Sequence, residues 1–264
     1  MHSIVIAREI WDTRDLDRKN LDEGGRVRAD ALATRFEPED LNALEMALQI
    51  KDKHGGKVTV LSLGAPRGVD VLKECLYRGV DAVVRVELPA GDELDTQAEA
   101  ELYAAAIGKI GAFDLVLTGV TVGDGRGSLA GAHLAARLDV ELITWMDALG
   151  EVGPERVVGR RAIEMGYEHI EVKLPAVLLV GVALLKDDPR SPRTAKAALK
   201  LKHKKTEVAS WTAESLGVAD LGARRTTVVA ARELIAERAI ESKSVDGADE
   251  AALGAMLAAI QKGN

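Results

Sequence analysis

Short apolar segments alternate with longer amphipathic ones along the first half of the chain. Four apolar runs, at residues 4–7, 58–64, 82–86 and 114–118, predict buried strands. Between them, apolar positions recur at helical spacing and predict helices that begin near residues 38, 69 and 96 and end at Gly55, Gly79 and Gly111. Strands that alternate with helices indicate an α/β fold with a doubly wound, mostly parallel sheet.

The pattern changes in the second half of the chain. Residues 157–163, 169–174 and 176–182 are β-rich and close together, so we expect antiparallel strands that extend the sheet. Residues 12–35 are charged and predict a surface hairpin. A lysine-rich helix is expected from about residue 195 to 205, and an alanine-rich helix from Glu250 to Gln261. From Trp211 on, strand signals are few, and we expect this tail to wrap a partner chain.

Composition narrows the class of protein. A chain of 264 residues with 47% hydrophobic content can build one sizeable core. The net charge of -7 argues against a general nucleic-acid binder. The single cysteine, Cys75, excludes an internal disulfide and indicates a reducing compartment. We find neither a signal peptide nor an apolar run of about 20 residues, the length that spans a bilayer, so a soluble cytoplasmic protein is expected.

A glycine-rich loop follows the run at 114–118. Gly123, Gly125 and Gly127 surround Asp124 and Arg126, and a helical pattern begins near Leu129. Glycines allow backbone amides to converge on an anion at the start of a helix, which is how proteins cradle phosphate. The spacing matches neither the dinucleotide fingerprint nor the Walker loop, so an ordinary tight turn is the alternative. Asp124 suits a helix cap or a ribose ligand, and Arg126 suits a phosphate partner or a solvated side chain.

The sequence contains no catalytic constellation. Its five histidines are scattered without metal-ligand spacing, and His133 fits a structural histidine better than a ligand. Cys75 lies among apolar helical positions and is expected to be an inert, buried thiol. Arg160 and Arg161 are expected on opposite faces of a strand. The lysine run from Lys196 to Lys205 is either a solvated face or a docking surface for an acidic partner.

The order of these motifs resembles the β (small) subunit of electron transfer flavoproteins, the FixA family. The resemblance covers roughly residues 1–210, and no single motif is specific to the family. It is carried by ordered segments at residues 4–7, 36–40 leading into 43–48, 60–64, 117–131, 173–177 and 189–190 before the lysine run. Glu37 stands where the family has asparagine, and Thr121 where it has glutamine, so the chain resembles a divergent member.

The resemblance implies an adenine nucleotide α-hydrolase-like fold with an antiparallel extension and a C-terminal arm. It implies a nucleotide-binding domain at 1–190, and at 191–264 a partner-recognition helix and an arm that docks on a larger α subunit. The protein would be an electron carrier rather than an enzyme. It would pass electrons from a flavin-dependent dehydrogenase to a downstream oxidoreductase, with FAD shared with the α subunit, and AMP or a second FAD bound here.

In such a sheet, ligands bind beyond the carboxyl ends of the strands, where the loops after Ala7, Leu63 and Gly119 are expected to converge. By resemblance, the nucleotide-binding residues are Ala7, Glu37, Pro38, Glu39, Asp40, Leu63, Gly119, Val120, Thr121, Val122, Gly123, Asp124, Gly125, Arg126, Gly127, Ser128, Leu129 and Ala130. The alternative is a stand-alone adenine-nucleotide-binding protein that resembles universal stress proteins, which share this sheet type.

Overall fold

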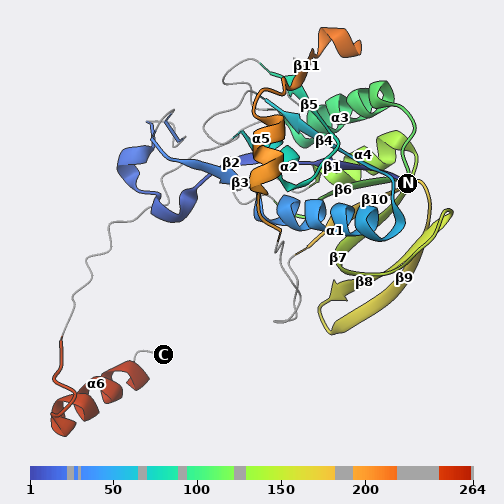
Figure 1. Cartoon of the computed structure of the whole chain (residues 1–264). Coiled ribbons are helices and arrows are strands. Elements are labelled where there is room, and N and C mark those ends of the chain that lie inside the picture. Colours follow the sequence, from blue (N-terminus) through green and yellow to red (C-terminus); the bar gives the residue numbers. More distant parts are fainter. Residues whose placement is uncertain are drawn as a thin grey trace. The chain divides into compact units, whose positions relative to one another are not determined.

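The computed structural model describes residues 1–22, 27–28, 31–64, 70–88, 94–121, 129–181, 193–218 and 244–262 (Figure 1). The chain forms two compact units, Met1–Val229 and Ala230–Asn264. In the second unit, the described residues contain the helix α6 (Glu250–Lys262), as the alanine-rich pattern predicts.

A nine-stranded sheet runs through the first unit, in the order β11-β5-β4-β1-β6-β10-β7-β8-β9. The strands from β11 to β7 are parallel, and β8 and β9 continue the sheet as an antiparallel extension. The expected α/β sheet with an antiparallel extension is therefore confirmed. The strands span β1 (His2–Ile6), β4 (Lys57–Leu63), β5 (Ala82–Glu87), β6 (Leu115–Gly119), β7 (Glu141–Val152), β8 (Arg156–Ile163), β9 (Gly166–Lys173), β10 (Ala176–Val180) and β11 (Ala209–Thr212).

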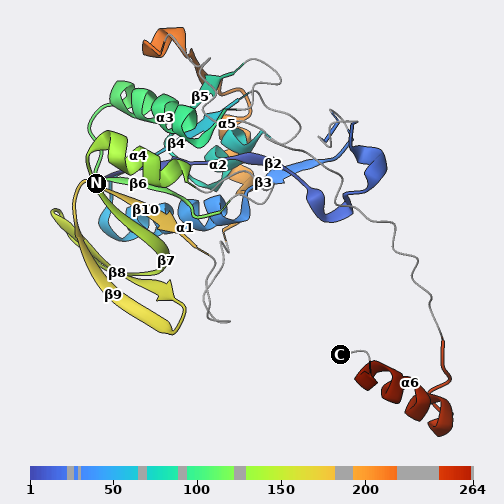
Figure 2. The same ribbon diagram turned by 180° about the vertical axis from the view of Figure 1, so that it is seen from behind.

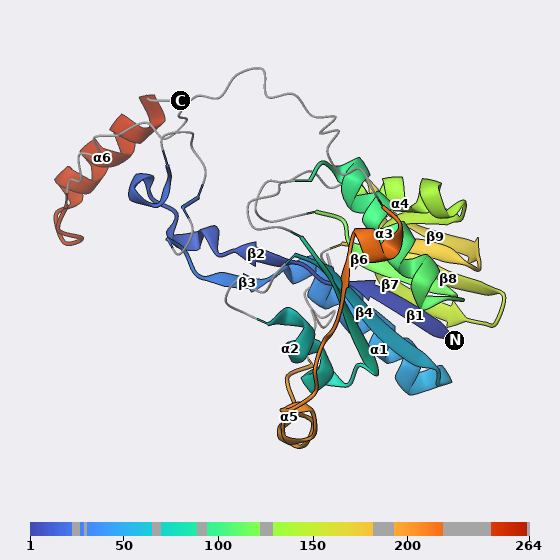
Figure 3. The same cartoon turned by 90° about the horizontal axis from the view of Figure 1, so that it is seen from above.

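Helices cover both faces of the sheet (Figure 3). The helices of this unit are α1 (Pro38–His54), α2 (Val71–Arg78), α3 (Thr96–Ile110), α4 (Ala130–Leu138) and α5 (Ala197–His203). Its described part also contains the 3-10 turns η1 (Thr13–Asp15) and η2 (Arg18–Asn20), which lie between β2 and β3 away from the sheet, and η3 (Glu214–Leu216). One core lies between the sheet and α1 and α2, and the other between the sheet and α3 and α4. This two-sided cover is the doubly wound arrangement that the sequence predicts.

The two cores follow from the alternation of side chains along β1. Val5 faces the α1 side, whereas Ile4 and Ile6 face the α3 side. Val5 pairs in register with Val60 and Leu117, so a row of apolar side chains crosses three strands on one face. Because both faces are covered, central strands must be apolar at nearly every position, which explains the continuous runs in the sequence.

Two strand predictions need correction. The segment 176–182 was expected to be antiparallel, but β10 is parallel and lies inside the sheet between β6 and β7. Its residues are buried throughout, which is typical of an interior parallel strand. The second correction concerns β11, which pairs with β5 at one edge although the sequence gives little strand signal there. Most of its side chains are exposed, so the apolar pattern of an interior strand is missing.

The charged segment 12–35 begins and ends in a short antiparallel pair, β2 (Glu9–Trp11) with β3 (Thr34–Phe36). This agrees with the expected hairpin, although residues 23–26, on which the predicted turn falls, lie outside the described part. At the other side of the molecule, β7, β8 and β9 form a meander that extends away from the helices (Figure 2).

The residues on either side of segment 182–192, Gly181 and Arg193, both bond to α1. Asn42 Nδ2 donates a hydrogen bond to the carbonyl of Gly181 at 3.4 Å. Arg193 Nε donates to Glu45 Oε2 at 3.2 Å, and its Nη2 donates to Asp52 at 2.7 Å. Asn42 and Glu45 lie about one turn apart on the helix. Gly181 and Arg193 are therefore held by the same helix.

Replacing Leu117 by alanine tests the central row of the core. Leu117 is fully buried in β6, so Leu117→Ala should lower the free energy of unfolding by about 2–5 kcal/mol, through lost burial and the cavity left behind. Urea denaturation measures this. The matched change Leu201→Ala, on the outer face of α5 where the side chain is 78% exposed, should stay within about 0.5 kcal/mol of the parent. Equal losses in both variants would contradict the assigned core.

Candidate functional site

The candidate site lies beyond the carboxyl ends of β1 and β6. Strands β4 and β5 lie on one side of β1, whereas β6 and β10 lie on the other, so the strand order reverses between β1 and β6. Loops diverge at such a point and leave a crevice in which ligands of open α/β sheets bind. The helix α1 begins at this same edge, because Glu37 N donates to the carbonyl of Arg8 directly after β1.

The start of α1 places three carboxylates in the interior. Glu37 is the N-cap, and its side chain accepts a hydrogen bond from Glu39 N; Pro38 occupies the first turn, where a missing N–H has no cost. Glu37, Glu39 and Asp40 are all buried. Acidic residues suit the positive end of the helix dipole, but buried carboxylates also require partners.

Asp40 receives those partners from both strands. Arg8 donates to it from the backbone N (2.9 Å) and from Nε (2.9 Å) and Nη2 (2.8 Å) of the guanidinium. From β6, Gly119 N donates to Asp40 Oδ1 at 2.8 Å, and the Thr118 hydroxyl at 3.3 Å. The fully buried carboxylate is therefore bonded to the ends of β1 and β6 at once. We call Arg8, Asp40 and Gly119 the brace.

The contact with Asp40 stabilises the protonated form of the Arg8 guanidinium. Burial by itself lowers the pKa of the Arg8 guanidinium, but the attraction and hydrogen bonds of Asp40 outweigh that effect, so the pKa is raised above its ordinary value. Arg8 therefore stays protonated at neutral pH. Its Nη2 also donates to the carbonyls of Gly119 (3.4 Å) and Thr121 (3.3 Å), which extends the brace toward the loop that follows.

Glu39 fixes the next part of that loop. Its Oε2 accepts a hydrogen bond from Thr121 N at 2.5 Å. Gly119 is required for this close approach, because a Cβ there would lie 2.6 Å from the Cβ of Glu39. The turn at residues 119–121 is thus held by Glu39 and Asp40 from α1 and by Arg8 from β1. Thr121 is the last described residue before the glycine-rich loop.

The structure brings together some of the predicted site residues. Ala7, Glu37, Glu39, Asp40, Gly119 and Thr121 belong to the brace or adjoin it, and Pro38 starts the helix that carries the acids. Val120 is buried beside them and bonds to Val180 of β10. Leu63 ends β4, one strand away, and packs into the core on the α3 side. Leu129 and Ala130 lie at the start of α4. The predicted contacts Val122, Gly123, Asp124, Gly125, Arg126, Gly127 and Ser128 lie outside the described residues.

Sequence reasoning missed Arg8 and Thr118. Arg8 directly follows the apolar run of β1, and a charged residue at the carboxyl end of a buried strand is the signal that was available. Its partner could not be inferred, because Asp40 and Gly119 are distant in sequence. Asp40 itself was expected to contact a nucleotide, whereas both of its oxygens are bonded to protein donors.

Other candidate groups have structural roles. His133 Nδ1 lies 3.3 Å from the Thr96 hydroxyl and links α4 to α3. Arg160 bonds to the buried Asp147, and Arg161 pairs with Glu168, so the two arginines separate as expected. Within the described residues, no group of three or more His, Cys, Asp or Glu side chains could hold a metal ion.

With this geometry in place, comparisons with known proteins identify the family. Residues 26–216 match the family described as electron transfer flavoprotein domain. An electron transfer flavoprotein subunit beta from Thermoanaerobacterium thermosaccharolyticum is 34% identical over 218 residues, which cover 83% of this chain and 81% of the relative. The chain belongs to the electron transfer flavoprotein family.

Two further relatives are similar to this chain over most of its length. Protein FixA from Azorhizobium caulinodans is 30% identical to this chain, and the aligned region covers 99% of this chain and 94% of the relative. The caffeyl-CoA reductase-Etf complex subunit CarD from Acetobacterium woodii is 34% identical over 72% of this chain and 71% of its own. One of these names is that of FixA and the other is that of a subunit of an Etf complex, so the resemblance found in the sequence is confirmed. None of the helices in the described part of the chain is long and apolar enough to cross a membrane.

Removing the charge of Asp40 tests the brace. Asp40→Asn keeps the shape of the side chain but leaves the Arg8 guanidinium buried without its anion, so we expect the free energy of unfolding to fall by about 3–5 kcal/mol. Glu171→Gln, which breaks the half-exposed Arg156–Glu171 pair, should cost about 1 kcal/mol or less. Chemical denaturation compares the two variants. An Asp40→Asn protein as stable as the parent would contradict the assigned role.

Cys75 should be unreactive in the folded protein. Burial raises the pKa of its thiol well above the ordinary value, so the reactive thiolate is scarce and the sulfur is covered. A colorimetric thiol reagent should therefore label no cysteine at neutral or mildly alkaline pH, and should label the single thiol once urea unfolds the chain. Fast labelling without urea would show that α2 opens readily.

Proposed function

We propose that this chain is the β subunit of a heterodimeric electron transfer flavoprotein. In this proposal it carries electrons from a flavin-dependent dehydrogenase to a downstream oxidoreductase, and it works only with an α subunit that holds most of a shared FAD. The family membership and the names of the relatives support the proposal. The flavin supplies the redox chemistry when it is bound, and the chain orients and encloses it.

We further propose that the crevice at the brace holds AMP, or a second FAD in its place. The observation that carries this is the brace, which fixes the turn at residues 119–121 where β6 leads into the glycine-rich loop. The start of α4 fits a phosphate, because Leu129 at its N-cap makes no side-chain hydrogen bond to the first turn.

The acidic residues at the start of α1 do not prevent phosphate binding in this arrangement. Asp40 is neutralised by Arg8, and Glu39 is directed to the Thr121 amide. In the proposed site, these residues shape the loop, while backbone amides and hydroxyls contact the ligand.

The proposed docking region at 191–264 includes α5 and α6. Of its described part, α5 packs on α2, and β11 joins the sheet, so residues 193–218 form part of the first unit. In α6, Met256, Leu257 and Ile260 are exposed. Their spacing places them along one side of the helix, which fits an arm that packs on another chain.

Co-expression with an α subunit of the same family tests the proposal. The expected product is a yellow heterodimer, and mass spectrometry of the denatured complex should detect FAD together with AMP, or more FAD than one molecule per heterodimer. The chain expressed alone should carry little flavin. A colourless homodimer that retains ATP would instead favour the stand-alone nucleotide-binding protein, and an empty complex would contradict the nucleotide site.

Glu39→Ala should weaken nucleotide retention in that complex. The substitution removes the charged acceptor of the Thr121 amide, and such hydrogen bonds contribute about 1.5–3 kcal/mol, so AMP affinity should fall roughly 10- to 100-fold. Equilibrium dialysis measures the affinity. Glu101→Ala, at an exposed position of α3, is the control and should bind AMP like the parent. Unchanged affinity in Glu39→Ala would show that the turn does not support the ligand.

A further inference from the structure

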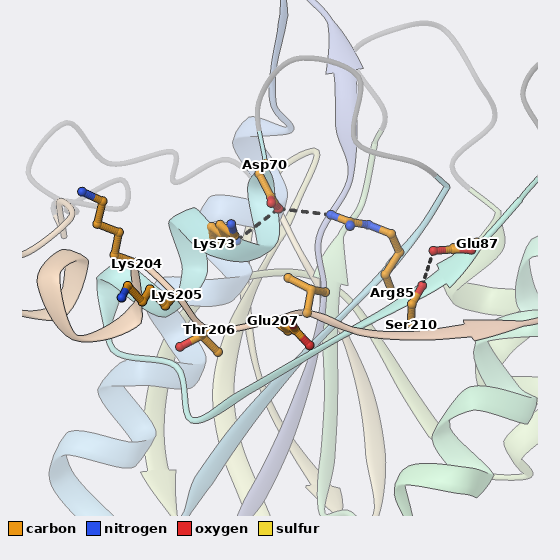
Figure 4. A pocket seen from close by; sticks show the side chains of 10 residues that line it. Asp70, Lys73, Arg85, Glu87, Lys204, Lys205, Thr206, Glu207 and Ser210 are labelled. Atoms are coloured by element: carbon orange, nitrogen blue, oxygen red, sulfur yellow. Dashed lines mark hydrogen bonds and ion pairs between the residues drawn. The ribbon is translucent and has the colours of Figure 1, made fainter.

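A polar pocket of about 490 Å³ lies at the same edge of the sheet but on the far side of β4 from the brace. Figure 4 shows its lining side chains, which come from the start of α2, the end of β5, and the stretch between α5 and β11. None of the brace residues lines it. Its volume falls in the range of small-molecule sites, which is about 300–1,000 Å³.

The guanidinium of Arg85 is the best-defined group in this pocket. Its side chain is only 13% exposed, and Arg85 Nη2 donates to Asp70 Oδ1 at 3.1 Å. Within the described residues this is the one hydrogen bond of the Arg85 side chain, although a guanidinium has five N–H donors. Asp70 is held in place as the N-cap of α2, where it accepts from Lys73 N. Arg85 is thus fixed, charged and largely unsatisfied by protein groups of the described part.

Three lysines add positive charge around Arg85. Lys73 lies on α2, on the other side of Asp70 from Arg85, and Lys204 and Lys205 follow α5 at the rim (Figure 4). In the described part of the chain, none of these ammonium groups makes an ion pair or hydrogen bond with a protein group. The cations outnumber the carboxylates of the lining by one, although the whole chain carries a net charge of -7. Such a local excess favours an anion.

Two further carboxylates of the lining, Glu87 and Glu207, can accept hydrogen bonds from hydroxyls. Glu87 Oε1 accepts from the Ser210 hydroxyl at 2.5 Å, and Glu207 adds a second carboxylate. Val208 is the one apolar residue among the described lining, so the pocket offers no surface for an aromatic base or an acyl chain. Cations and carboxylates alternate along the lining, with Asp70 between Lys73 and Arg85 and Glu87 beyond Arg85 (Figure 4). Such a mixed surface matches a ligand that carries both a phosphate and hydroxyls.

We propose that this pocket binds a small phosphorylated polyol, with the phosphate on Arg85 and Lys73 and the hydroxyls near Glu87. This site is separate from the proposed AMP or FAD site, and it does not depend on the proposed function. The planar fork of Arg85 provides parallel donors for two phosphate oxygens, and Lys73 adds a point charge.

Isothermal titration calorimetry of the full chain with ribose 5-phosphate, in physiological salt, tests the proposal. Ribose 5-phosphate should bind, ribose should not, and inorganic phosphate should bind more weakly. Arg85→Gln and Lys73→Gln should each weaken binding roughly tenfold or more, because each removes a charge-assisted hydrogen bond. Because Arg85→Gln also removes the partner of Asp70, Lys73→Gln serves as the variant that leaves the fold intact.

Two controls separate this site from general charge and from the glycine-rich loop. Lys173→Gln, on the edge strand β9, makes the same change of charge far from the pocket and should leave the affinity unchanged. The proposal is overturned if ribose 5-phosphate does not bind, or if Lys173→Gln weakens it as much as Lys73→Gln. It is also overturned if Arg126→Ala abolishes binding while Lys73→Gln has no effect, or if a hexaglutamate peptide binds as tightly as the sugar phosphate.

Discussion

The buried ion pair between Arg8 and Asp40 constrains the rest of the structure. Removing two charges from water is costly, and the cost is offset only when both are paired and hydrogen-bonded with good geometry. The carboxylate meets this condition through donors from Arg8, just after β1, and from Gly119, at the end of β6. The end of β1, the first turn of α1 and the end of β6 must therefore come together in one register, or the interior holds an uncompensated charge.

Charged side chains are paired differently at two places along the carboxyl edge of the sheet. The carboxylates of Asp40 and Glu39 on α1 are bonded to protein groups: Asp40 accepts from Arg8 and Gly119, and Glu39 accepts from the Thr121 amide. Any influence of Asp40 on a bound molecule is therefore indirect, through the shape of the turn. Farther along the edge, Arg85 has a single carboxylate partner in the described residues, so charge there remains available. The same edge thus holds one fully hydrogen-bonded ion pair at the brace and, at Arg85, a guanidinium with donors that the described residues do not use.

Local pattern was sufficient for most of the elements and insufficient for the site. The runs containing Val5, Val60 and Leu117 predicted the central strands, because an interior parallel strand is apolar on both faces. A similar apolar run in β10 led to the prediction of an antiparallel strand, because its closeness in sequence to the preceding strands suggested that it pairs with them in the sheet. The exposed edge strand β11 had no such signal. The brace joins positions 8, 40 and 119, and a single sequence gives no information on which distant charges meet.

The attachment of Gly181 and Arg193 to α1 has a consequence for the length of the chain between these two anchors. Since Gly181 and Arg193 are both bonded to α1, a change in the number of residues between them makes closure of the chain there only slightly less favourable. A change of length in that stretch is thus compatible with both anchors and with the helix that holds them.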